Sequence, residues 1–181
     1  MGAFSKARRP FLLWFGVMIF ATVGSQLPFD RLIMTVDDWS RLHPDYDTFA
    51  QIGLSRYQPK AMRFKTSMTP NDYQKAMQAS DLIIAHAGMG TIISALELGK
   101  PLLLMPRLAS QGEHRNDHQL ATIKQMTQKF PHIVVAYNET ELLQELECYR
   151  IKKHDNPSII KESLTVSPKL LDAIKSFITT E

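Results

Sequence analysis

The sequence predicts an α/β fold, a doubly wound parallel sheet of the Rossmann-like kind. Short apolar runs typical of buried strands alternate along the chain with longer segments whose apolar residues recur at helical spacing. Such alternation indicates βαβ units, which build a parallel sheet with helices on its faces. The chain has 181 residues, 44% hydrophobic and 22% charged, which suits one soluble core.

The first half of the chain accounts for three strands and two helices. The predicted elements are strands over 18–24, 47–54 and 62–68 and helices over 29–42 and 69–79. The second helix has a clear start, because Thr69 is a good N-cap and Pro70 suits the first helical position. It is expected to end near Ala79, just before the next apolar run.

The second half continues the alternation. The predicted elements are strands over 82–85, 102–105 and 133–136 and helices over 89–98, 116–129 and from the Asn138 cap onward. An irregular stretch from Lys152 and a closing helix over 168–178 are expected to follow. We therefore predict three parts, which are an appendage over 1–17, a Rossmann-like domain over 18–150, and an irregular segment with a helix over 151–181.

The appendage over 1–17 carries basic residues before an apolar run from Phe11 to Val23, which imitates a secretory signal. The run is too short to span a bilayer, which needs about 20 apolar residues. Two interpretations stay open. Residues 1–17 form a membrane-interfacial segment with Arg8 and Arg9 near the lipid headgroups, or they are a start-site extension.

Charge and cysteine content limit the partners and the compartment. The formal net charge is only +3 and the Lys and Arg residues are scattered, so nucleic-acid binding is not predicted. The single cysteine, Cys148, excludes an internal disulfide and suits a reducing cytosol. Cys148 lies in a helical pattern, where we expect it to pack.

The run His86-Ala87-Gly88-Met89-Gly90-Thr91 directly follows one predicted strand and precedes a helix. Small residues there allow a ligand to approach the backbone, and the free amides of a first helical turn bind anions. A phosphate or diphosphate fits this pattern, and a tight turn that merely needs glycine fits it equally well. The run is neither a P-loop nor the dinucleotide fingerprint G-x-G-x-x-G.

Two further segments are expected near that run. The turn Gly24-Ser25-Gln26 follows the first strand, where it either meets a ligand or simply caps a helix through Ser25. Polar side chains crowd 113–119, which favours a polar ligand. His114 and His118 lie four residues apart, but Arg115 stands where a zincin motif has glutamate, so no metal site is predicted.

Three motifs in this order resemble a known family: "MIFATVGSQLPFDRL", "HAGMGTIISALELGKPLLLMPR" and "EHRNDHQLA". They are similar to the C-terminal, nucleotide-sugar-binding domain of GT-B glycosyltransferases of family 28. The resemblance covers about 18–148. In length the chain is most similar to the stand-alone PssE-type subunits of bacterial exopolysaccharide synthesis, and to the catalytic subunit of the eukaryotic two-piece dolichol-linked N-acetylglucosaminyltransferase.

The resemblance implies a hexosyltransferase that takes a UDP-sugar donor, inverts the anomeric carbon, and uses neither metal nor other cofactor. One GT-B half is present, so a membrane-anchored partner subunit would bring the lipid-linked acceptor. The enzyme would work in the cytoplasm, peripheral to the inner face of the membrane, in exopolysaccharide or capsule biosynthesis. A sugar-nucleotide epimerase and a non-catalytic regulatory subunit stay as alternatives.

The same resemblance implies roles for individual residues. His86, Gly88, Gly90 and Thr91, with the backbone of Ala87 and Met89, would face the diphosphate, and Gly24, Ser25 and Gln26 would close its other side. Asn116, Asp117, His118 and Gln119 would meet the sugar. His86 is the candidate catalytic residue, and the general base stays unassigned, with the partner as one alternative. One position departs from the family: Ser94 stands where relatives carry a ribose-binding glutamate, and Glu97 is a candidate substitute or merely an exposed helix charge.

Overall fold

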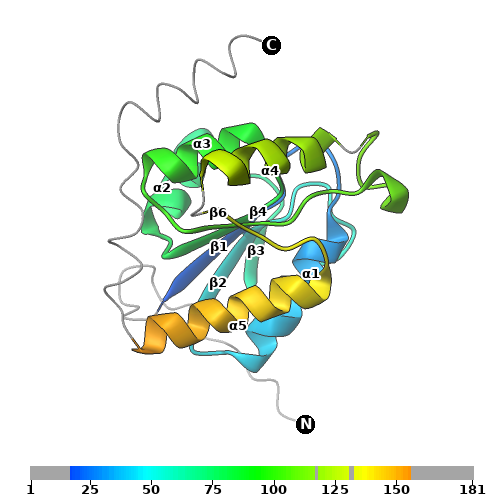
Figure 1. Cartoon of the computed structure of the whole chain (residues 1–181). Coiled ribbons are helices and arrows are strands. Elements are labelled where there is room, and N and C mark those ends of the chain that lie inside the picture. The colour runs from blue at the N-terminus through cyan, green and yellow to red at the C-terminus, as the bar shows by residue number, and fades with distance from the viewer. Residues whose placement is uncertain (1–16, 117, 131–132, 156–181) are drawn as a thin grey trace.

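The predicted α/β fold is confirmed by the computed structural model, which describes residues 17–155 except 117 and 131–132 (Figure 1). In chain order, the elements are β1 (Met18–Thr22), α1 (Asp30–Leu42), β2 (Asp47–Gln51), β3 (Arg63–Lys65), α2 (Pro70–Ala79), β4 (Leu82–Ala85), α3 (Met89–Glu97), β5 (Leu102–Leu104), the 3-10 turn η1 (Ala109–Gln111), α4 (His118–Lys129), β6 (Ile133–Val135) and α5 (Glu139–Asp155).

All six strands form one parallel sheet in the order β3-β2-β1-β4-β5-β6. The order reverses between β1 and β4, whose last residues pair as Thr22 with Ala85. The chain therefore leaves these two strands at neighbouring points and runs in opposite directions across the sheet. Ligands of open α/β sheets bind in the crevice outside such a reversal.

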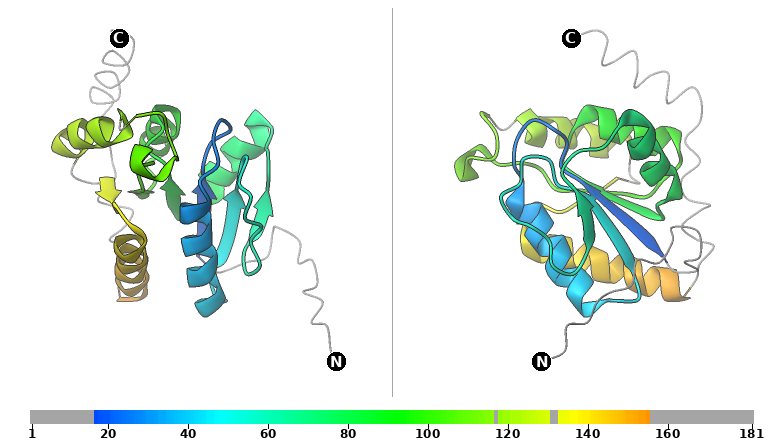
Figure 2. Two further views of the ribbon diagram at one scale, coloured as in Figure 1. Left: turned by 90° about the vertical axis from the view of Figure 1, so that its right-hand side faces the viewer. Right: turned by 180° about the vertical axis from the view of Figure 1, so that it is seen from behind.

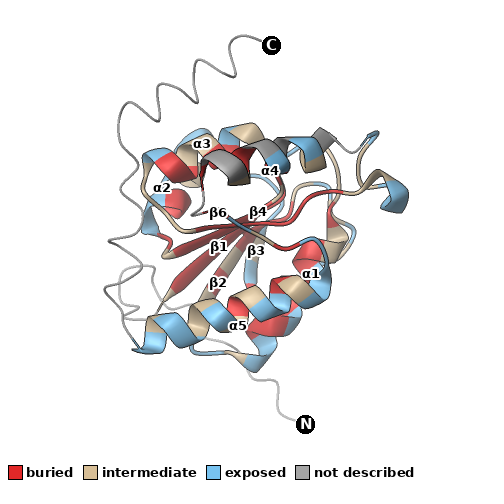
Figure 3. Ribbon diagram, in the orientation of Figure 1, coloured by how far each residue is buried: buried red, intermediate tan, exposed pale blue. Residues whose placement is uncertain are grey.

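The sheet lies between two layers of helices, with α1 and α5 on one face and α2, α3 and α4 on the other (Figures 1 and 2). Alternating strand residues reach opposite faces. In β1, Ile19 and Ala21 pack with Trp39 of α1, whereas Phe20 packs with Met77 of α2. Both layers are buried toward the sheet and exposed outward (Figure 3).

Some predicted boundaries differ from the structure because a local turn or a distant side chain binds the backbone at the end of a strand. β2 ends at Gln51, where the carbonyl of Ile52 accepts the Ser55 N–H at 3.0 Å and turns the chain. β3 begins only at Arg63, since the N–H of Met62 donates to the Asp37 carboxylate at 3.0 Å.

Toward the C-terminus the structure also departs from expectation. α4 starts at His118 rather than at residue 116, and α5 continues to Asp155 through the first residues expected to be irregular. Cys148 is exposed on α5, so the expectation that it packs was wrong. Residues 1–16 and 156–181 lie outside the described residues, and the three-part division stays a prediction. No helix among those described is long and apolar enough to cross a bilayer.

Glu147 on α5 joins the two helices of one layer. Its carboxylate accepts the indole N–H of the buried Trp39 at 2.7 Å and pairs with His43 at 3.0 Å. Glu147→Ala leaves the indole N–H without its partner, so we expect the free energy of unfolding to fall by about 1–3 kcal/mol. Urea denaturation measures it, with the exposed Gln144→Ala on the same helix as control. Equal stability of both variants would contradict the prediction.

Candidate functional site

Two adjoining pockets open at the carboxyl edge of the sheet. The first, here the loop pocket, has a volume of about 420 Å³. It is lined by Val23, Gly24, Ser25, Gln26, Leu27, His86, Gly88, Gly90, Thr91, Arg107, His114 and Gln119. The second, here the helix pocket, has a volume of about 560 Å³. It is lined by Gly24, Ser25, Gln51, Met68, Pro70, Tyr73, Gln74, Met77, Ser94, Glu97 and Leu98. Gly24 and Ser25 line both, so the pockets are neighbours.

The N-terminus of α3 forms one wall of the loop pocket. The N–H of Gly88 donates to the carbonyl of His86 at 2.7 Å, and the N–H of Thr91 donates to that of Gly88 at 3.1 Å. Met89 and Gly90 occupy the first helical positions, where the helix itself provides no carbonyl for the backbone N–H groups. The N-cap residue is Gly88, which has no side chain to accept a hydrogen bond from them. These amides and the positive end of the helix dipole suit an anion.

His86 packs between two glycines. A Cβ at Gly24 would lie 2.9 Å from the imidazole Cε1, and one at Gly88 would collide with the same ring. Gly24 also has a φ of 73°, which favours glycine. Close packing therefore favours glycine at both positions, and for Gly88 this fits the tight-turn alternative. Gly90 differs, because a Cβ there would meet no protein atom within 4 Å. Packing does not require glycine at position 90.

The burial of His86 makes it a neutral imidazole at physiological pH. Desolvation first, and then the positive charge of Arg107, lower the pKa of His86 to about 4. The Nδ1 atom is buried and makes no well-formed hydrogen bond with any described residue. The ring therefore offers polar atoms to the site without adding positive charge.

The loop after β1 is held by the ends of two strands. The amide of Gln51 at the end of β2 accepts the hydroxyl of Thr22 at 2.6 Å and donates to the carbonyl of Gly24 at 3.3 Å. Helix α1 starts only at Asp30, with Phe29 as its N-cap, so Ser25 does not cap it. The helix-cap alternative for Ser25 is therefore wrong, and the ligand-facing role of Gly24-Ser25-Gln26 stays a prediction.

The polar segment 113–119 divides between structural and pocket roles. Glu113 forms a bidentate ion pair with Arg31 at 2.8 and 2.9 Å, and it does not line the pocket. Gln119 lines the loop pocket, with its side-chain oxygen accepting the backbone N–H of Arg107 at 3.0 Å. His114 lines the pocket as well, and Asn116 is exposed outside it.

The structure brings together eight of the predicted site residues in the loop pocket. They are Gly24, Ser25, Gln26, His86, Gly88, Gly90, Thr91 and Gln119. The side chains of Ala87 and Met89 instead pack against the core under α2–α4. Asp117 lies outside the described residues, as does the side chain of His118. Among the residues described, no cluster of three or more potential metal ligands occurs, and metal independence stays a prediction.

No role was predicted for Arg107. This residue lies in the loop that follows β5, at the same edge of the sheet. Its side chain is 3% exposed and donates to the carbonyls of Val23 and Leu27, both at 2.8 Å. Arg107 thereby ties the loop after β5 to the loop after β1. Its position just beyond an apolar strand was the available indication.

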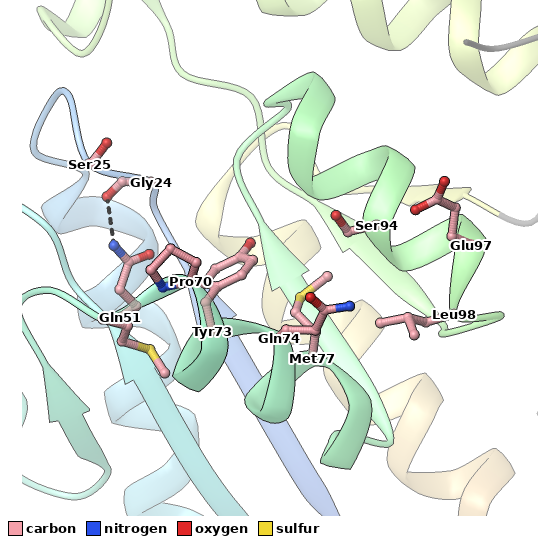
Figure 4. A pocket seen from close by; sticks show the side chains of 11 residues that line it. Gly24, Ser25, Gln51, Pro70, Tyr73, Gln74, Met77, Ser94, Glu97 and Leu98 are labelled. Carbon is pink, nitrogen blue, oxygen red and sulfur yellow. Dashed lines mark hydrogen bonds between the residues drawn. The ribbon is translucent and has the colours of Figure 1, made fainter.

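The helix pocket was also not expected. It lies between α2 and α3, with Tyr73 and Met77 on one side and Ser94 and Glu97 on the other (Figure 4). The Tyr73 hydroxyl lies 3.0 Å from the hydroxyl of Thr91, so the aromatic ring is fixed beside the first turn of α3. An aromatic and thioether wall faced by polar groups is the composition of small-molecule sites.

Comparison with known proteins adds a family and a fold. The model of the glycosyltransferase family 28 C-terminal domain matches residues 18–170. No curated protein sequence matches significantly.

Among solved structures, a glycotransferase of kitacinnamycin superposes with a TM-score of 0.65 at 19% identity, covering 92% of this chain and 41% of that one. A UDP-GlcNAc 2-epimerase from Neisseria meningitidis gives 0.57 at 10%, covering 91% and 43%. ALG13 gives 0.54 at 17%, covering 83% and 98%. At these identities the likeness shows the fold. The chain spans less than half of the first two proteins.

Proposed function

Since the match over residues 18–170 shows that the chain belongs to the family of glycosyltransferase family 28 C-terminal domains, we propose that it is the donor-binding, catalytic subunit of a two-chain glycosyltransferase. Its donor is a UDP-sugar. The observation that carries this proposal is the loop pocket, where the amide end of α3, the space beside Gly90 and the cation of Arg107 meet. Such a combination suits a diphosphate.

The two pockets together have room for the whole donor. We assign the diphosphate to the loop pocket and the nucleoside to the helix pocket, where Tyr73 and Met77 offer apolar surface and Gln74 offers an amide. Glu97 lies in the same pocket as Ser94, which suits it to the ribose hydroxyls. The sugar is assigned to the Gln119 side, with Asn116, Asp117 and His118 as further candidates.

The acceptor half is assigned to a partner chain. The chain covers 41% of the kitacinnamycin glycotransferase and 98% of ALG13, so a domain of this size occurs both within a longer chain and as most of one. We propose a membrane-anchored partner that presents a lipid-linked acceptor. The complex then acts in exopolysaccharide or capsule synthesis, peripheral to the inner face of the membrane.

The proposed chemistry is direct displacement with inversion at the anomeric carbon. The α3 amides and the helix dipole stabilise the charge that develops on the departing UDP. An imidazole with a pKa of about 4 is a weak base at neutral pH. We therefore propose His86 as a hydrogen-bonding group for the donor, and place the base that deprotonates the acceptor on the partner.

Nucleotide selectivity tests the donor class. Ligand-observed NMR of the protein with UDP, GDP and CMP is expected to show saturation transfer from UDP alone, because the helix pocket presents defined polar groups to one base. Equal transfer from all three nucleotides would contradict a UDP-specific site.

Catalysis itself is tested in the assembled complex. His86→Ala and Gln119→Ala are expected to abolish sugar transfer while leaving association with the partner intact. Transfer that persists at the wild-type rate in both variants would instead identify a non-catalytic regulatory subunit.

A further inference from the structure

Arg107 is a buried cation whose charge no described carboxylate neutralises. Its guanidinium donates to three backbone carbonyls of the loop after β1, those of Val23, Leu27 and Pro28. A fourth, longer bond reaches the backbone carbonyl of Glu113 at 3.5 Å, but within the described residues no Asp or Glu carboxylate oxygen lies within 4.0 Å of the guanidinium. The guanidinium carbon also lies 4.8 Å from the centroid of the Phe29 ring. Carbonyl dipoles and an aromatic face compensate a full charge only in part, and buried charges are normally paired.

The nearest carboxylate is engaged elsewhere. Glu113 pairs through both oxygens with Arg31, and one of them also accepts the N–H of Leu108 at 2.9 Å. Arg31 also pairs with Glu139 at 3.6 Å, so among the described residues Arg31 has two carboxylate partners while Arg107 has none in direct contact. Desolvation lowers the pKa of Arg107 to about 10, with Glu113 opposing the shift only in part. Arg107 still carries its proton at neutral pH.

The excess charge lies beside the amide end of α3. Arg107 lines the loop pocket together with His86 and Gly90, and its Nε–H donates to no described residue. The lining also contains two imidazoles, those of His86 and His114. Among the described residues, Arg107 is the one arginine or lysine that lines the loop pocket.

We propose that Arg107 supplies the counter-charge for the diphosphate of the donor, while the same side chain holds residues 23–28 in the conformation that binds it. The identity of the anion as a diphosphate rests on the proposed function. The charge argument stands without it. Arg107 is thus an anion-binding and positioning residue that couples the loops after β1 and β5.

The experiment is calorimetric titration of the full chain with inorganic pyrophosphate, UDP and uridine. In Arg107→Gln the affinity for pyrophosphate and for UDP is expected to fall about tenfold to a hundredfold, the usual range for a charged hydrogen bond. The affinity for uridine, which has no phosphate, is expected to stay near the wild-type value. Arg107→Lys keeps the charge but lacks the planar guanidinium. Its affinity for pyrophosphate and UDP is therefore expected to lie between those of wild type and Arg107→Gln.

Arg41→Gln is the matched control. Arg41 is exposed in the last turn of α1, at the opposite edge of the sheet, and its one ion pair with a described residue is to the exposed Asp38. Arg41→Gln removes the same unit of charge as Arg107→Gln and is expected to leave the affinities for pyrophosphate, UDP and uridine unchanged. If Arg41→Gln also lowered the affinity for pyrophosphate, the loss in Arg107→Gln would be an effect of net charge alone, and the proposal would be overturned.

Other outcomes are equally decisive. Wild-type pyrophosphate affinity in Arg107→Gln, or an equal loss for uridine, would mean that Arg107 only shapes the loop. Should Arg107→Gln not fold, arginine-labelled wild-type protein answers the question, since the Nε–H resonance of Arg107 must shift on adding pyrophosphate. Pyrophosphate binding without nucleotide binding would refute the proposed donor and leave Arg107 as the anion site.

Discussion

Gly90→Val is expected to weaken UDP binding by more than about a hundredfold in a protein that folds as stably as the wild type. A Cβ at this position meets no protein atom within 4 Å, so a valine side chain occupies only space open to a ligand. It also covers the amides at the start of α3. Valine costs no more than glycine in a helix, so stability is expected to hold. Calorimetry with UDP and urea denaturation measure the two effects.

Gly88→Ala separates the ligand role of the loop from its packing role. A Cβ at position 88 collides with the imidazole of His86, so this smaller change is expected to destabilise the fold by about 1–3 kcal/mol. Thr140→Val, at the equivalent position of α5, controls for valine in a first helical turn. Wild-type affinity for UDP in Gly90→Val would remove the diphosphate from the loop pocket.

The contrast between these glycines shows what sequence patterns reveal about a loop. Spacing alone predicted a glycine-rich turn between a strand and a helix, and it left ligand approach and tight packing as equal alternatives. The structure assigns packing to Gly24 and Gly88, which flank His86, and leaves Gly90 without a packing reason. Neighbours in three dimensions decide between the alternatives, and periodicity carries no information about them.

The order of the strands and helices was predictable because burial imposes it locally. Each apolar run had to be covered on both faces, and a parallel sheet brings all strand ends to one edge. The convergence of the loops after β1 and β4 follows from that geometry. The start of β3 was not predictable, since Asp37 binds the backbone of a segment distant in the sequence.

The missed site features also depend on long-range contacts. Glu113 stood in a polar run that favoured a ligand, yet its partner Arg31 lies 82 positions away. The helix pocket exists because α2 packs beside α3, which neither helix pattern reveals (Figure 4). Arg107 shows the same difficulty, because three of its carbonyl partners belong to the loop after β1, about 80 positions away in the sequence.

The stability of the fold is expected to depend on pH through His86. The pKa of His86 is about 4 in the folded chain, against an ordinary value of 6.5. Between these values the unfolded chain binds more protons, so acid favours unfolding. The contribution of neutral His86 to the free energy of unfolding is fully present above pH 6.5 and is lost as the pH falls toward 4. From about pH 7.5 to about pH 4.5 the free energy of unfolding should decrease by about 2–3 kcal/mol on this account.

His86→Gln isolates that contribution from all other titrating groups. Urea denaturation across this pH range measures the free energy of unfolding of both proteins. The value for wild type minus that for His86→Gln is expected to decrease as the pH falls. His154→Gln removes an exposed histidine of α5 and is expected to follow the wild-type curve. Parallel curves for wild type and His86→Gln would mean that the imidazole is solvated, and the packing of His86 between Gly24 and Gly88 would no longer explain why both positions are glycine.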